Sequence, residues 1–152
     1  ENIMVVKKRE AFKDVDLGGR KWRIGRFDAM TGSYITMLVL MQMLPMGMDE
    51  QIGVGSIGKG RSLMDKKTFF DVQADCLKIC SELQQVGESV APIPVMLDDG
   101  RWGVGGVEDD LTTILALTVH TLIFNISDFF QEGALNDLTK TFSGLSQFNA
   151  KE

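Results

Sequence analysis

Residues 14–24 of the chain read DVDLGGRKWRI, and this stretch decides the fold of the N-terminal part. Gly18-Gly19 is a two-residue turn that tolerates the positive φ angles of a tight β-hairpin. With the two glycines as the loop, one face of the hairpin carries apolar side chains, namely Val15, Leu17, Trp22 and Ile24. The other face carries two opposite-charge pairs, Asp14 with Arg23 and Asp16 with Lys21. Because a one-residue slip would destroy both patterns, the sequence predicts this register.

An apolar helix is expected directly after the hairpin. Thr31 or Ser33 can cap its start, and Pro45 marks its end. Its body, residues 34–44, is apolar on nearly every side. A helix of that kind is either buried on all sides or covered by a partner, and self-association is one such cover. We therefore expect a homo-oligomer.

The remaining chain predicts further helices and a second hairpin. Glycines make residues 46–62 a flexible loop, and apolar residues at three- and four-residue steps predict an amphipathic helix over 65–86 that stops at Gly87. A second hairpin is expected to turn at Asp99-Gly100, with Leu97 facing Trp102. A third helix is expected from the acids 108–110 to about residue 127, and a short last helix over 136–142.

These elements predict one fold class. We expect a predominantly helical α+β fold with about four helices and one or two small β-hairpins. Residues 1–152 are expected to form a single domain, since domains cluster at roughly 100–150 residues. It would consist of an N-terminal hairpin over 12–27, a helical body over 31–142 and a frayed tail over 143–152.

Charge and composition exclude several classes of function. The net charge of −5 disfavours nucleic-acid binding, which relies on Lys and Arg at phosphates. The most apolar run, 111–126, is interrupted by polar residues and predicts no membrane span. Cys76 and Cys80 are expected to share a helix face as reduced thiols, which suits a cytoplasm.

A glycine-rich motif raises an alternative function. Residues 53–59 read GVGSIGK, which matches the phosphate-binding pattern G-x-x-x-x-G-K. That chemistry needs Ser or Thr next, to hold magnesium, and a preceding buried strand. Gly60 follows instead, and the preceding residues 46–52 contain Gly47, Asp49, Glu50 and Gln51, which do not suit a buried strand. A loop without nucleotide is the favoured interpretation. The alternative function is a small phosphate- or nucleotide-binding protein that uses residues 53–60, and Lys59 and Arg61 could also make an anion or partner contact.

No catalytic or metal-binding constellation is evident. His120 is the one histidine, and together with Cys76 and Cys80 it would lack the fourth ligand of a structural zinc site. The serines lack a G-x-S-x-G context. The sequence therefore predicts no enzyme, no metal and no cofactor.

The methionines point to a binding surface instead. Six of the nine lie between residues 30 and 48. Methionine is flexible and is over-used on surfaces that adapt to varied apolar partners, although it also fills loosely packed cores. The residues expected to contact a partner are Trp22, Tyr34, Met37, Met41 and Leu44.

Residues 12–44 carry a resemblance to a known family. The hairpin, the strand WRIGRF at 22–27 and the apolar helix that opens at Thr31-Gly32 resemble the tail assembly chaperones of long-tailed bacteriophages. The resemblance implies a non-catalytic protein of the bacterial host cytoplasm, which binds the hydrophobic tape measure protein, and also the tail tube protein, while the tail assembles. It transfers no binding residue. A structural component of the phage tail or connector is a further alternative.

Overall fold

The computed structural model describes residues 9–43 and 64–131 of the chain. Several predictions fall outside these residues: Leu44, the loop over 46–62 with Lys59 and Arg61, the helix over 136–142 and the tail over 143–152. The described residues form two compact units, one within Glu1–Arg26 and Leu77–Thr121, the other within Phe27–Cys76 and Leu122–Glu152. The single domain over 1–152 stays a prediction.

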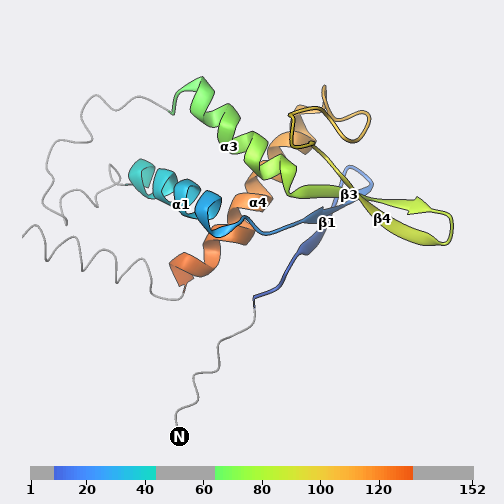
Figure 1. The fold of residues 1–152 in the computed structure, drawn as a ribbon, viewed down its shortest axis with the longest axis horizontal. Helices are drawn as coiled ribbons and strands as arrows, with labels where there is room; N and C mark the ends of the chain where they lie inside the picture. Colours follow the sequence, from blue (N-terminus) through green and yellow to red (C-terminus); the bar gives the residue numbers. More distant parts are fainter. Residues whose placement is uncertain (1–8, 44–63, 132–152) are drawn as a thin grey trace, which may run out of the picture. The chain divides into compact units, whose positions relative to one another are not determined.

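The first unit contains a four-stranded antiparallel sheet (Figure 1). Its strands are β1 (Lys13–Leu17), β2 (Arg20–Ile24), β3 (Cys80–Val86) and β4 (Ser89–Pro94), and they lie in the order β1-β2-β3-β4. The described residues therefore hold this sheet and three helices, so the prediction of a predominantly helical fold with about four helices is wrong.

The N-terminal hairpin has the predicted register. Asp14 pairs with Arg23, Val15 with Trp22 and Asp16 with Lys21. Gly18 and Gly19 have φ angles of 59° and 74°, the left-handed values that a two-residue hairpin turn requires. The Arg23 Nε donates to Asp14 Oδ1 at 2.9 Å across the charged face. The prediction is confirmed because local turn geometry and cross-strand patterning agree.

The helix predicted over 65–86 is wrong in its second half. The helix α3 spans Lys66–Lys78, and the chain then enters β3, which pairs with β2 through Trp22 and Glu82. Gly87 is not a helix stop: its φ of 64° opens the two-residue turn between β3 and β4. Pairing with two neighbouring strands overrides the helical propensity of the Glu and Gln residues in this segment. Cys76 and Cys80 consequently lie on different elements.

The second predicted hairpin is reduced to a short turn. Met96 forms an isolated bridge with Trp102, and Leu97 N donates to Arg101 O at 2.8 Å. The pairing is thus shifted by one residue from the predicted Leu97–Trp102 pair. Asp99 explains the shift, because its carboxylate accepts hydrogen bonds from the backbone N and the Nε of Arg101.

The helix α4 (Leu111–Gln131) contributes its first three turns to the core of the first unit. Asp110 caps its start, since the backbone N of Thr113 donates to Asp110 Oδ1 at 3.1 Å. The Cys80 Sγ lies 3.0 Å from the Thr121 Oγ1. The buried core of this unit comprises Trp22, Ile24, Leu77, Cys80, Val95, Val104, Val107 and Leu117.

The second unit is helical. It contains α1 (Ala29–Met43), most of α3 and the C-terminal part of α4. Its buried cluster comprises Ile35, Val72, Cys76 and Ile126, with Phe27, Leu38, Val39 and Leu122 packed against it. The backbone N of Phe27 donates to the Asn125 Oδ1 at 3.0 Å, which fixes the chain just before α1.

Candidate functional site

The start of α1 is fixed by Asp28 rather than by the predicted Thr31 or Ser33. Asp28 Oδ1 accepts from the Thr31 backbone N at 3.0 Å, and Asp28 Oδ2 accepts from the Thr31 hydroxyl at 2.7 Å. These bonds lower the pKa of Asp28 below its ordinary value. Ser33 donates its hydroxyl to Ala29 O instead. The helix is therefore anchored at its N-terminus in one orientation.

The helix α1 has an inner and an outer side. Ile35 is fully buried in the cluster of the second unit, with Leu38 and Val39 beside it. The opposite side exposes four large apolar side chains, which we call the outer face of α1: Met30, Tyr34, Met37 and Met41. A single helix thus serves a core and a solvent-facing surface, and both are apolar.

The outer face of α1 is a continuous stripe along the helix. Its residues follow at steps of four, three and four, the alternation that places side chains on one seam of a coiled coil. The whole of α1 reads AMTGSYITMLVLMQM and contains no charged residue. Exposed apolar side chains grouped in this way, unlike isolated ones, are typical of a protein–protein interaction surface.

The structure separates the predicted contact residues. It brings Tyr34, Met37 and Met41 together on the outer face of α1. Trp22 belongs to the first unit and is fully buried there, and its indole Nε1 donates to Leu17 O at 3.1 Å. A side chain in that position supports the sheet and offers no surface to a partner. Met30, 83% exposed, was not selected from the sequence, although it stands four residues before Tyr34.

Reactive groups do not converge within the described residues. Burial raises the pKa of the Cys80 thiol to about 11, so the thiolate that would act as nucleophile is suppressed. No group of three metal-ligating side chains occurs in 9–43 and 64–131, which include His120 and both cysteines. Over the same residues, no helix is long and apolar enough to cross a membrane.

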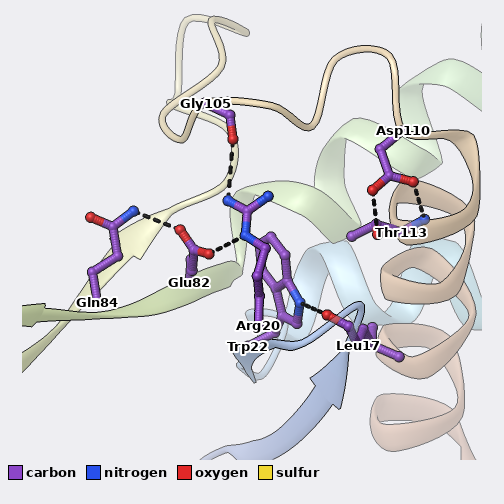
Figure 2. A network of polar contacts seen from close by, with 8 residues as sticks. All are labelled: Leu17, Arg20, Trp22, Glu82, Gln84, Gly105, Asp110 and Thr113. Carbon is purple, nitrogen blue, oxygen red and sulfur yellow. Dashed lines mark hydrogen bonds and ion pairs between the residues drawn. The ribbon is translucent and has the colours of Figure 1, made fainter.

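A polar network in the first unit centres on Arg20 and Glu82 (Figure 2). The Arg20 guanidinium lies over the Trp22 ring at 4.7 Å, forms an ion pair with Glu82 and donates to Gly105 O at 3.1 Å. Glu82 also accepts from the Gln84 Nε2 at 2.6 Å. The ion pair raises the pKa of Arg20 and lowers that of Glu82.

The members of this network are bonded to one another. Arg20 joins β2 to β3 through Glu82, and joins both to the loop before α4 through Gly105. The Glu82 carboxylate accepts from both Arg20 and Gln84, so it is used by internal partners. The network therefore has a structural role, because it holds β2, β3 and the loop before α4 together. The outer face of α1 remains the candidate site.

A family model described as "Phage tail assembly chaperone protein, TAC" matches residues 18–136. The chain belongs to the phage tail assembly chaperone family. The match extends well beyond residues 12–44, which carry the resemblance visible in the sequence, and it includes β2, β3, β4 and all three described helices. Comparisons with curated proteins and with solved structures give no match.

Proposed function

We propose that this chaperone binds hydrophobic helical segments of the tape measure protein along the outer face of α1, without catalysing a reaction. It would keep those segments soluble in the host cytoplasm while the tail assembles. The observation that carries the proposal is the exposure of Met30, Tyr34, Met37 and Met41 on one side of a helix whose other side is already packed.

The spacing of the outer face supports a helical partner. The steps of four, three and four residues keep the stripe on one side of α1, so it can stay in contact with a second helix that carries its own apolar seam. Three of the four side chains are methionines, which change rotamer readily and so can pack against seams of different sequence. A surface of this kind suits a chaperone that meets many segments of one long protein.

The absence of charge along α1 indicates that the hydrophobic effect would drive partner binding. No residue of α1 can form an ion pair with the partner, so affinity would come from removing apolar surface from water. We expect binding to be nearly independent of salt, because screening acts on charges. Contacts with the tail tube protein and self-association through the same face are further proposals that this surface would support.

The proposal is tested by co-expressing the chain with the tape measure protein of the same phage. The change is Met37→Glu combined with Met41→Glu, which places two carboxylates on the outer face of α1. Burying a methionine contributes about 1.5–3 kcal/mol, so we expect affinity to fall at least about a hundredfold and the tape measure protein to become insoluble. Thermal unfolding of the variant checks that α1 is still folded.

Leu115→Glu combined with Val119→Glu is the matched control, because it also adds two carboxylates at exposed apolar positions of a helix. Leu115 lies on α4 and is 45% exposed, the same fraction as Met37. We expect this variant to bind and to keep the tape measure protein soluble like the unmodified chain. Equal losses in both variants would show that exposed apolar surface in general does the binding, and unchanged binding in the α1 variant would refute the proposal.

A further inference from the structure

The sheet of the first unit ends in two edge strands, β1 and β4. Along an antiparallel strand, successive residues point their backbone N–H and C=O groups alternately to one neighbour and to the other side. Gly25 N donates to Ile79 O, so the odd-numbered residues of β2 face β3 and the even-numbered ones face β1. Because Trp22 pairs with Val15, Val15 faces β2, and the backbone groups of Asp14 and Asp16 point away from the sheet.

The β4 edge is blocked by proline. Val95 N donates to Cys80 O, so the odd-numbered residues of this segment face β3. The outward positions of β4 are therefore Val90, Pro92 and Pro94, of which the two prolines have no N–H to donate. Proline at such positions prevents another strand from pairing with an edge. The β1 edge has no equivalent, because its outward residues are aspartates with intact N–H groups.

The charges beside the β1 edge are ordered in columns. Asp14 and Asp16 form an acidic column on β1, and Arg23 and Lys21 form a basic column opposite them on β2. The other face of β1 carries the half-buried Val15 and Leu17. A strand added beside β1 would continue the alternation of sign if it placed basic side chains next to the acidic column and apolar ones next to Val15.

We propose that the β1 edge accepts an extended segment of another polypeptide, with alternating basic and apolar residues, as a fifth strand of the sheet. Four backbone groups are available to it: the N–H and C=O of Asp14 and of Asp16. A second copy of this chain is disfavoured as the occupant. Antiparallel pairing of two β1 edges bonds outward residues to outward residues, so it sets aspartate against aspartate. This surface is independent of the outer face of α1.

The test uses the full chain and a synthetic eight-residue peptide in which Lys and Val alternate. We expect fluorescence anisotropy to show that this peptide binds at least about tenfold more tightly than a Glu/Val peptide of the same length. Added salt should weaken the binding. In the proposed pairing the lysine amides face β1 and the valine amides face solvent. N-methylation of the lysine amides should therefore abolish binding, while N-methylation of the valine amides should change it less than threefold. Equal effects of the two modifications, or equal binding of the Glu/Val peptide, would overturn the proposal.

Variants of Asp16 give a second, independent test. Asp16→Pro removes one outward N–H and leaves the β1–β2 ladder intact, as Pro92 does on β4, so peptide binding should fall at least about tenfold. Asp16→Lys keeps the backbone N–H and should shift the binding preference toward the Glu/Val peptide. This variant tests the proposal even if Asp16→Pro does not fold. Neither should alter binding through α1. A dimer in light scattering that Asp16→Pro dissociates would assign the edge to a second copy and overturn the proposal.

Discussion

Replacing Glu82 by Gln removes the negative charge from the Arg20–Glu82 ion pair of the first unit and keeps the shape of the side chain. The Glu82 side chain is 10% exposed and that of Arg20 is 32% exposed. A hydrogen bond between charged groups contributes about 1.5–3 kcal/mol when it is shielded from water. Arg20 is partly solvated and keeps its bond to Gly105 O, so we place the loss in the lower part of that range, at about 1.5–2 kcal/mol.

The stability that the Glu82→Gln variant loses should become smaller as the pH falls. The hydrogen bond from Arg20 lowers the pKa of Glu82 in the folded protein, so folding favours the deprotonated acid. The stabilisation is therefore fully present above the pKa of Glu in the unfolded chain, about 4.3, and is lost as pH falls through the lower folded pKa. The unmodified chain should exceed the Glu82→Gln variant in stability at neutral pH and approach it in strong acid.

Urea unfolding, followed by far-UV circular dichroism near pH 7 and near pH 3, measures the loss of stability in the variant and the dependence of that loss on pH. For a chain of this length a loss of about 1.5–2 kcal/mol corresponds to roughly 3–8 °C in Tm. Asp14→Asn is the matched control, since the Asp14–Arg23 pair lies at the surface and should contribute much less. A Glu82→Gln variant as stable as the unmodified chain would refute the reasoning, and so would a difference of the same size at both pH values.

Three further predictions concern the same unit. Gly103→Ala should destabilise the fold by at least about 1–3 kcal/mol in urea unfolding, because an added Cβ would lie 2.0 Å from Pro94 O; a stable variant would contradict the close approach. Pro92→Val should restore an outward N–H on β4 and increase self-association in light scattering at unchanged folding stability, and self-association equal to that of the unmodified chain would contradict the role of the prolines. The Cys80 thiol, with a pKa of about 11, should react with a disulfide reagent near pH 8 only after unfolding, and rapid reaction of the native chain would contradict its burial.

Local patterns in the sequence were sufficient for the first hairpin and for two of the helices. The β1–β2 register follows from two glycines and from the alternation around them, and the helices α1 and α4 follow from long apolar segments. The segment 80–86 was assigned to a helix because Cys80 and Leu83 stand three residues apart among polar residues. Its partner β4 follows directly through the turn at Gly87, a local signal that the prediction took for a helix stop. Its other partner β2 lies more than fifty residues away in the chain, and no local pattern carries that pairing.

The candidate site was predicted in part for the same reason. Tyr34, Met37 and Met41 were selected as apolar residues of one helix, and helical periodicity placed them together. Periodicity could not tell the inner side of α1 from the outer side, because both are apolar. Trp22 shows that residue type does not predict burial. Tryptophan is typical of an interface, but the packing of the first unit shows that this side chain is buried.

Short stretches of the sequence were enough to predict the first hairpin, the apolar character of α1 and the resemblance to tail assembly chaperones. These depend on turn chemistry, side-chain spacing and residue type, which are properties of short stretches. The tertiary structure decided that 80–86 is a strand, that Trp22 is internal and that one side of α1 faces solvent. Burial and strand pairing depend on residues far apart in the chain, and only the folded arrangement brings those residues together.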